Sequence, residues 1–226
     1  MQKAVAKNIL VIPDIHGRTF WHGAVMKYWS EVDRIVFLGD YLDPYPSEEN
    51  IADDIVANFN EIINLKKRNL DKVILLKGNH DEHYSSEIFR KQACGSRFDS
   101  ENSDKYHKLF AENSSLFNLA HLEKVGETYY LFSHAGLTVY WLNKVNHHLW
   151  HMSDNRISVA SPNIIERINA MDNHPKGQEL LATIGSYRSF LKGEKTGSIL
   201  WADVNEHPIV YPPQCSHGGH RKSQVR

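Results

Sequence analysis

The chain has 226 residues, of which 41% are hydrophobic and 23% charged, proportions typical of a globular protein with a packed core. Its formal net charge of −1 at pH 7 gives no general electrostatic attraction to nucleic acid or to an anionic membrane surface. No apolar stretch approaches the ~20 residues that span a bilayer, and the N-terminus lacks the features of a secretory signal. Cys94 and Cys215 fit no metal-binding or redox spacing, so two reduced thiols are the plainer interpretation, although a disulfide stays open. We therefore expect a cytoplasmic protein with no nucleic-acid or membrane partner.

Short runs rich in Val, Ile, Leu and Phe predict buried strands, which are Asn8–Ile12, Arg34–Leu38, Lys72–Leu76, Thr128–Phe132 and Ser198–Trp201. Segments with helical spacing of apolar residues separate them, namely Phe20–Trp29, Ile51–Asn69, Glu87–Lys91, Tyr106–Asn113, Leu137–Met152 and Pro162–Met171. We expect irregular structure at Tyr41–Asn50, Cys94–Asp104 and Asp172–Gln178. Alternating strands and helices predict an α/β fold. Because no repeat or flexible linker divides the chain, we expect one domain over residues 1–226, with an atypical C-terminal tail from about residue 205.

Four of these strands end in glycine-containing turns that carry polar side chains. The turns are Asp14-Ile15-His16-Gly17, Gly39-Asp40-Tyr41-Leu42-Asp43, Gly78-Asn79-His80-Asp81 and Ser133-His134-Ala135-Gly136. Ligands of open α/β sheets bind at the carboxyl ends of strands, so these side chains can converge on one crevice. Gly-Asp and Gly-Asn pairs are also ordinary turn chemistry, and each motif alone is weak. All four together, in this order, favour a functional site over four unrelated turns.

The residue types in these turns suit metal ions. Carboxylate oxygens, an amide oxygen and imidazole nitrogens form a ligand set suited to Mn, Fe or Zn. Asp14 and His16 are two residues apart, so on an extended segment both side chains face the same way. A carboxylate such as Asp40 can bridge two cations, and a pair of cations ~3.5–4 Å apart can activate water and neutralise a transferring phosphoryl group. The sequence therefore predicts a two-metal centre for phosphoester hydrolysis.

The four motifs resemble those of the calcineurin-like metallophosphoesterase superfamily, and Leu200-Trp201-Ala202-Asp203 resembles a segment of its serine/threonine phosphoprotein phosphatase branch. The chain looks closest to the serine/threonine phosphoprotein phosphatase branch and its small bacterial and phage relatives, from about Leu10 to Asp203. The resemblance implies a four-layer sandwich in which two mixed β-sheets are flanked by helices. It also implies a phosphatase that hydrolyses phosphomonoesters, on a phosphoprotein or a small phosphoester, by direct attack of a metal-bound hydroxide.

The same resemblance implies a role for each motif residue. Asp14 and His16 would bind the first metal and Asp40 would bridge both, while Asn79, His134 and a late histidine would bind the second. For the late histidine we expect His220, because Gly219-His220 matches the family's Gly-His pair, with His217 as the alternative. Two divalent ions are implied, and we expect Mn, with Fe or Zn as alternatives.

The resemblance further implies that His80 is the general acid that protonates the leaving group, oriented by Asp43. Phosphoprotein phosphatases place a phosphate-gripping arginine directly after that aspartate, and here the position is Pro44. Proline cannot replace the bidentate fork of an arginine, so Arg97 and Arg18 are the candidates to bind substrate phosphate. Phosphodiester or dinucleoside-polyphosphate hydrolysis stays an alternative. The unusual tail also leaves open a non-catalytic binding domain of the same fold.

Overall fold

The computed structural model describes residues 6–48, 52–92, 97–150, 164–185 and 196–206. Its larger sheet is built from β1 (Ile9–Ile12), β2 (Arg34–Phe37), β3 (Val73–Leu76) and β4 (Phe117–Asn118), in that order across the sheet. All neighbouring pairs in this sheet run parallel. The carboxyl ends of its strands therefore meet at one edge, as the sequence predicts for the site.

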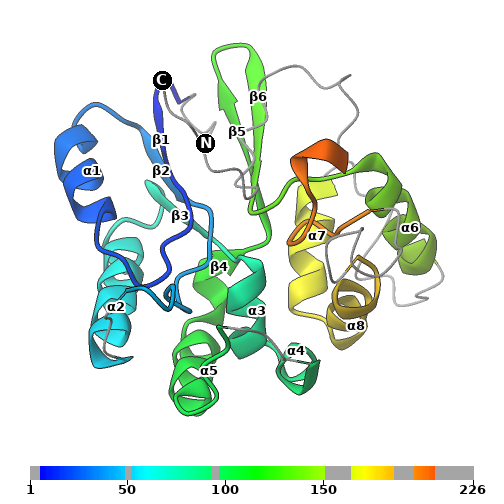
Figure 1. Cartoon of the computed structure of the whole chain (residues 1–226). Helices are drawn as coiled ribbons and strands as arrows, with labels where there is room; N and C mark the ends of the chain where they lie inside the picture. The colour runs from blue at the N-terminus through cyan, green and yellow to red at the C-terminus, as the bar shows by residue number, and fades with distance from the viewer. Residues whose placement is uncertain (1–5, 49–51, 93–96, 151–163, 186–195, 207–226) are drawn as a thin grey trace.

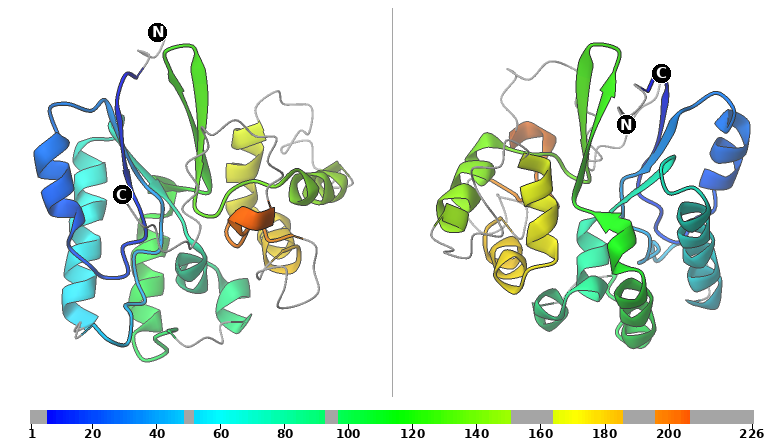
Figure 2. Two further views of the ribbon diagram at one scale, coloured as in Figure 1. Left: turned by 45° about the horizontal axis from the view of Figure 1, so that its top comes forward. Right: turned by 180° about the vertical axis from the view of Figure 1, so that it is seen from behind.

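The second sheet is an antiparallel hairpin of β5 (Ala120–Val125) and β6 (Thr128–Ser133). Three helices lie beyond it, namely α6 (Val139–Trp150), α7 (Ile164–Asp172) and α8 (Pro175–Thr183). On the far side of the larger sheet lie α1 (Trp21–Tyr28) and α2 (Ala52–Arg68). Figure 1 shows these four layers from left to right, and the views in Figure 2 agree.

The four-layer α/β prediction is thus confirmed. Within the described residues one sheet is parallel and the other antiparallel, where mixed sheets were expected. Three short helices close the end at which the parallel strands finish: α3 (Asn79–Ser85), α4 (Glu87–Gln92) and α5 (Ser103–Glu112). None of the described helices is long and apolar enough to cross a lipid bilayer.

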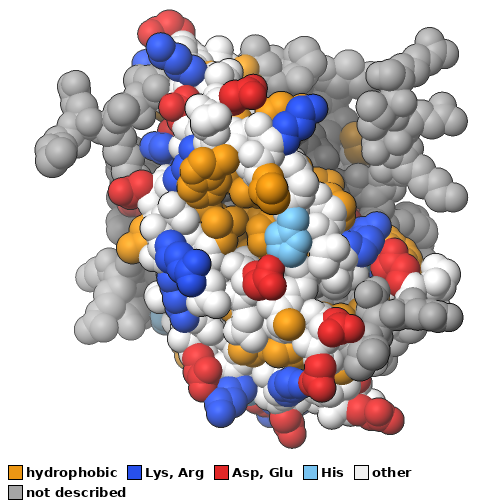
Figure 3. All heavy atoms as spheres, turned by 90° about the vertical axis from the view of Figure 1, so that its left-hand side faces the viewer, with side chains coloured by type: hydrophobic (Ala, Val, Ile, Leu, Met, Phe, Trp, Pro, Cys, Tyr) orange, Lys and Arg blue, Asp and Glu red, His pale blue; other side chains and the backbone are white. Residues whose placement is uncertain are grey.

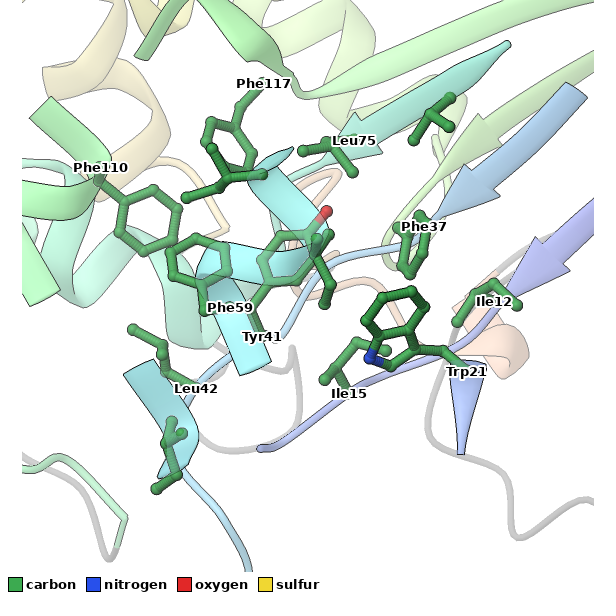
Figure 4. Close-up of a cluster of buried hydrophobic side chains, with 14 of the residues drawn as sticks. Ile12, Ile15, Trp21, Phe37, Tyr41, Leu42, Phe59, Leu75, Phe110 and Phe117 are labelled. Carbon is green, nitrogen blue, oxygen red and sulfur yellow. The ribbon is translucent and has the colours of Figure 1, made fainter. Parts of the chain in front are cut away.

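Alternation along β2 builds two separate cores. Ile35 and Phe37 face α1 and α2 and belong to an aromatic-rich cluster that includes Trp21 and Phe59, drawn in part in Figure 4. Val36, one position along, faces the hairpin and packs with residues of both sheets. Because both faces of the strand are buried, its sequence is continuously apolar. On the outer face of α1 and α2, Figure 3 shows acidic and basic side chains scattered around an apolar patch.

Some elements differ from the sequence prediction. Ser198–Trp201 was expected to be a strand and is a buried turn, in which Ser198 O accepts hydrogen bonds from the N–H groups of Trp201 (2.9 Å) and Ala202 (2.8 Å). Gly197 permits this turn because a Cβ there would lie 2.6 Å from Ala202 N. Asp172–Gln178 was expected to be irregular, but α8 begins within it at Pro175, with the His174 side chain accepting from Lys176 N. Strands β4 and β5 and helix α3 were not predicted.

A buried ion pair joins the two halves of the molecule. Lys77, directly after β3, lies 2.8 Å from both carboxylate oxygens of Asp172 at the end of α7. Its Nζ is also 3.5 Å from Glu82 of α3 and 3.2 Å from the Ser85 hydroxyl. Burial opposes the charge of Lys77, but Glu82 and Asp172 outweigh it and hold its pKa above the ordinary value. The pair therefore fixes the segment that leads into Asn79.

Candidate metal centre

Side chains from both sheets meet at the carboxyl edge of the parallel strands. Asp14, Asp40 and Asn79 follow β1, β2 and β3, and the ligand atoms of Asp14, His16 and Asp40 lie within 4.8 Å of one another. His134, directly after β6, places its Nε2 3.6 Å from Asp40 Oδ2 and 2.9 Å from Asn79 Oδ1. The structure thus brings together five of the six residues that the sequence predicts as metal ligands.

The backbone at this site is locally strained. Among the described residues, the non-glycine positions with positive φ are His16 (47°), Asp40 (52°) and Asp43 (58°). Such conformations cost of order 1–3 kcal/mol each and cluster at functional sites in proteins. Two glycines allow the turns after β2 and β3 to touch: a Cβ on Gly39 would lie 2.3 Å from Gly78 N, and one on Gly78 would lie 2.1 Å from Asp40 Oδ1.

The Asp81 side chain links the turn after β2 to the turn after β3 through hydrogen bonds. It is fully buried, and its Oδ2 accepts hydrogen bonds from the N–H groups of Asp40 and Gly78, both at 2.8 Å. Its Oδ1 accepts from Tyr41 N at 2.9 Å. Three backbone donors on one carboxylate hold the Asp40 turn and the Asn79 turn in a fixed relation. The sequence contains Asp81 only as the last letter of a motif and gives no hint of this role.

Both histidines present the same nitrogen to the centre. His16 Nδ1 lies 3.0 Å from Leu42 O and His134 Nδ1 lies 2.9 Å from Leu38 O. Because a carbonyl can only accept, each Nδ1 carries a proton and donates it, and in the neutral ring Nε2 then holds the lone pair. The two Nε2 atoms lie 3.5 Å and 3.6 Å from Asp40 Oδ2. A second partner that orients the ring in this way is typical of metal-binding imidazoles.

The donor set fits divalent cations. Asp40 Oδ2 is buried and accepts no hydrogen bond from any described residue, although two imidazole nitrogens face it. His134 Nε2 lies 2.9 Å from Asn79 Oδ1, and in the neutral ring with Nδ1 protonated both atoms present lone pairs. Two such buried acceptors need a proton or a metal cation between them. The arrangement therefore suits a divalent cation among Asp14, His16 and Asp40, with Asn79 and His134 beside them.

Burial lowers the pKa of His16 to about 4, so its imidazole is neutral at pH 7. Burial works against the charge of Asp40, but His134, His80 and His16 outweigh it and hold the pKa of this carboxyl below its ordinary value. Burial also lowers the pKa of His134, yet Asp40 and Asp14 outweigh burial, and the pKa lies above the ordinary value. A carboxylate and a neutral imidazole are the forms that bind metals, so a metal ion at His134 would compete with a proton for Nε2.

Next to this centre lies the pair expected to protonate a leaving group. His80 Nδ1 donates to Asp43 Oδ2 at 2.7 Å, and the hydroxyl of Tyr84 donates to the other carboxylate oxygen of Asp43. Tyr84 follows His80 by one helical turn in α3, and that spacing is the signal that could have identified it. Asp43, His80 and His83 form a second group whose possible metal-ligand atoms lie within 4.8 Å of one another.

The two candidate arginines lie differently. Arg97 donates to His80 Nε2 at 2.7 Å, and its Nη1 lies 3.3 Å from both ring nitrogens of His16 and 3.3 Å from Asp43 O. Its guanidinium therefore sits between the candidate ligands and the candidate acid. Arg18 instead donates to the carbonyl groups of Ile15 and Asp14, both at 3.0 Å, on the loop that carries the first ligands. His220 and His217 lie outside the described residues.

Comparison with known proteins identifies the family. The family model for calcineurin-like phosphoesterases matches residues 7–203. One solved structure that the chain matches is a protein serine/threonine phosphatase from Saccharomyces cerevisiae with similarity to human phosphatase PP5, at 17% identity and a TM-score of 0.35. The match covers 61% of this chain and 40% of the yeast chain, so it spans less than half the length of the yeast chain. The search of curated proteins gives no match. From the extent of the family match, the chain belongs to the calcineurin-like phosphoesterases.

Proposed function

We propose that this protein hydrolyses phosphomonoesters, including phosphoserine or phosphothreonine, at a centre of two divalent metal ions. The observation that carries the proposal is the position of Asp40 Oδ2, which is buried and lies 3.5 Å from Nε2 of His16 and 3.6 Å from Nε2 of His134. When bound, two cations supply an activated water and neutralise charge on the transferring phosphoryl group. Mn is the ion that we propose, with Fe or Zn as alternatives, because the ligand set mixes oxygen and imidazole donors.

Six residues would serve as ligands of the two metal ions. Asp14 and His16 would hold one ion, Asn79 and His134 the other, and Asp40 both. We also assign the sixth ligand to His220, or alternatively to His217.

Two side chains would meet the substrate directly. His80 would donate to the leaving oxygen from Nε2, once Arg97 turns from that nitrogen to the phosphate oxygens, because its Nδ1 is engaged by Asp43, which Tyr84 orients in turn. Arg97 would bind the phosphate oxygens, because its guanidinium already lies against both His16 and His80. Arg18, held by the carbonyl groups of Ile15 and Asp14, is the second residue that we propose for phosphate binding.

A leaving-group series tests the role of His80. His80→Ala should lower turnover about 10²–10⁴-fold for alkyl phosphates, whose leaving groups need a proton, and much less for nitrophenyl phosphate. His22→Ala is the matched control, since His22 also pairs with a carboxylate (Glu61, 2.8 Å) but on the exposed surface of α1 and α2. Equal losses for good and poor leaving groups would remove His80 as the acid.

A panel of substrates tests the reaction class. A phosphopeptide, an aryl phosphate, a nucleotide diester and a dinucleoside tetraphosphate should be compared on the metal-loaded protein, and the monoesters should give the highest kcat/KM. Preference for the diester or the tetraphosphate would replace the proposed substrate class. Retention of metal with no turnover on any of the four would favour a non-catalytic binding domain.

A further inference from the structure

Tyr45 lies at the edge of the candidate centre, next to Pro44, which stands where the phosphoprotein phosphatases have an arginine. The loop continues from Asp43 as Pro44-Tyr45-Pro46, and the Tyr45 side chain is 36% exposed. Its ring stands edge-on to the ring of His16, with centroids 5.1 Å apart and an interplanar angle of 75°. An exposed aromatic ring is thus held against a candidate metal ligand.

The two candidate phosphate-binding arginines both lie over this ring. Arg97 Cζ is 4.5 Å from the ring centroid of Tyr45, and Arg18 Cζ is 5.5 Å from it. Within the part of the chain that the structure describes, no carboxylate oxygen lies within 4.0 Å of Arg97, whereas Arg18 has Glu48 at that distance. Among the described residues, Arg97 is therefore held by the Tyr45 ring, an imidazole nitrogen and a carbonyl oxygen, with no carboxylate to neutralise it, and its charge stays available to an anion.

We infer that Tyr45 is a positioning residue, which holds the Arg97 guanidinium over the centre so that it can bind the dianionic phosphate of a monoester. This inference rests on the proposed function. A guanidinium donates to the non-bridging oxygens of a phosphate, of which a monoester has three and a diester has two. If two cations engaged two of these oxygens, one would remain for Arg97 on a monoester and none on a diester. By positioning Arg97, the Tyr45 ring thereby favours the binding of monoesters over diesters.

Three substitutions at position 45 separate the ring from its hydroxyl and its bulk. Tyr45→Ala and Tyr45→Leu remove the aromatic face, and the loss of one cation–π contact corresponds to about 3- to 30-fold in binding. Both should raise KM for an aryl phosphate and the inhibition constant of orthophosphate by that factor, with kcat changed less than about threefold. Tyr45→Phe keeps the ring and should recover most of the affinity. For a nucleotide diester the change in KM should be smaller.

Tyr129→Ala is the matched control, because Tyr129 is 62% exposed and also has a cation over its ring, Lys124 at 5.7 Å, but lies on the hairpin. Calorimetric binding of orthophosphate to the Mn²⁺-loaded variants gives a second readout that needs no turnover. An unchanged inhibition constant and affinity in Tyr45→Ala would overturn the inference, even if the wild-type protein is an active phosphatase. A Tyr45→Phe variant as impaired as Tyr45→Ala would also overturn it. Failure of the proposed function would instead appear as absent wild-type turnover, with the calorimetric comparison still decisive for Tyr45.

Discussion

Removal of the buried charge of Lys77 tests whether the ion pair with Asp172 holds the two halves of the molecule together. In Lys77→Met, the carboxylates of Asp172 and Glu82 lose the cation that lies 2.8 Å and 3.5 Å away and stay buried. Breaking a buried pair on one side costs about 3–5 kcal/mol. For a domain of this length, each kcal/mol lowers Tm by roughly 2–4 °C, so we expect a fall of about 6 to 20 °C.

The assay is thermal or urea unfolding of the metal-free protein, so that bound cations do not contribute. The double variant Lys77→Met/Asp172→Leu removes both members of the pair and should recover most of the loss. Lys176→Met is the matched control, because Lys176 pairs with Glu179 at 2.7 Å on the surface, and it should change stability by less than about 1 kcal/mol. Equal effects of Lys77→Met and Lys176→Met would refute the reasoning.

Two further predictions follow from the same region. Gly78→Ala should weaken metal binding strongly, because its Cβ would lie 2.1 Å from Asp40 Oδ1, and equilibrium dialysis with Mn²⁺ checks this; an unchanged dissociation constant would mean that the two turns can separate without cost. Burial raises the pKa of Glu82 to about 7 from 4.5, with Lys77 opposing and Asp172 adding to the shift. Because the folded state holds this proton more tightly than the unfolded chain, Glu82 contributes most to the free energy of unfolding below pH 4.5. That contribution falls as pH rises through 7, by up to about 3 kcal/mol in total. Glu82→Gln should remove this part of the pH dependence of urea unfolding, and an unaltered pH profile would contradict it.

The convergence of Asp14, Asp40 and Asn79 could be predicted because each follows a continuously apolar run, and parallel strands bring their carboxyl ends together. The pattern also predicted an α/β fold, whereas the four layers were implied by the family resemblance. His134 was harder, since it comes from the other sheet, and its place among the ligands was implied by family resemblance rather than by spacing.

The remaining features depend on contacts between distant segments, which a single sequence does not display. The carbonyl groups of Leu38 and Leu42 orient the two imidazoles, yet backbone atoms carry no residue-specific signal. The segment Ser198–Trp201 is apolar like a strand because it is a buried turn, and not because it pairs with a neighbouring strand. Tyr45 looked like an ordinary loop residue between two prolines, and only the fold brings Arg97 onto its ring.

The metal dependence of turnover, compared between the wild type and Asp40→Asn, tests the proposed two-metal centre most directly. The protein should be stripped with a chelator and assayed on an aryl phosphate, with Mn, Fe, Zn, Co and Mg restored one at a time and bound metal counted. We predict that the stripped protein is inactive, that a transition metal restores turnover with two ions per chain, and that Asp40→Asn loses both. Asp71→Asn, at an exposed acid just before β3, should behave as the wild type. Turnover without metal, or an Asp40→Asn variant that keeps two ions and full activity, would contradict the central claim.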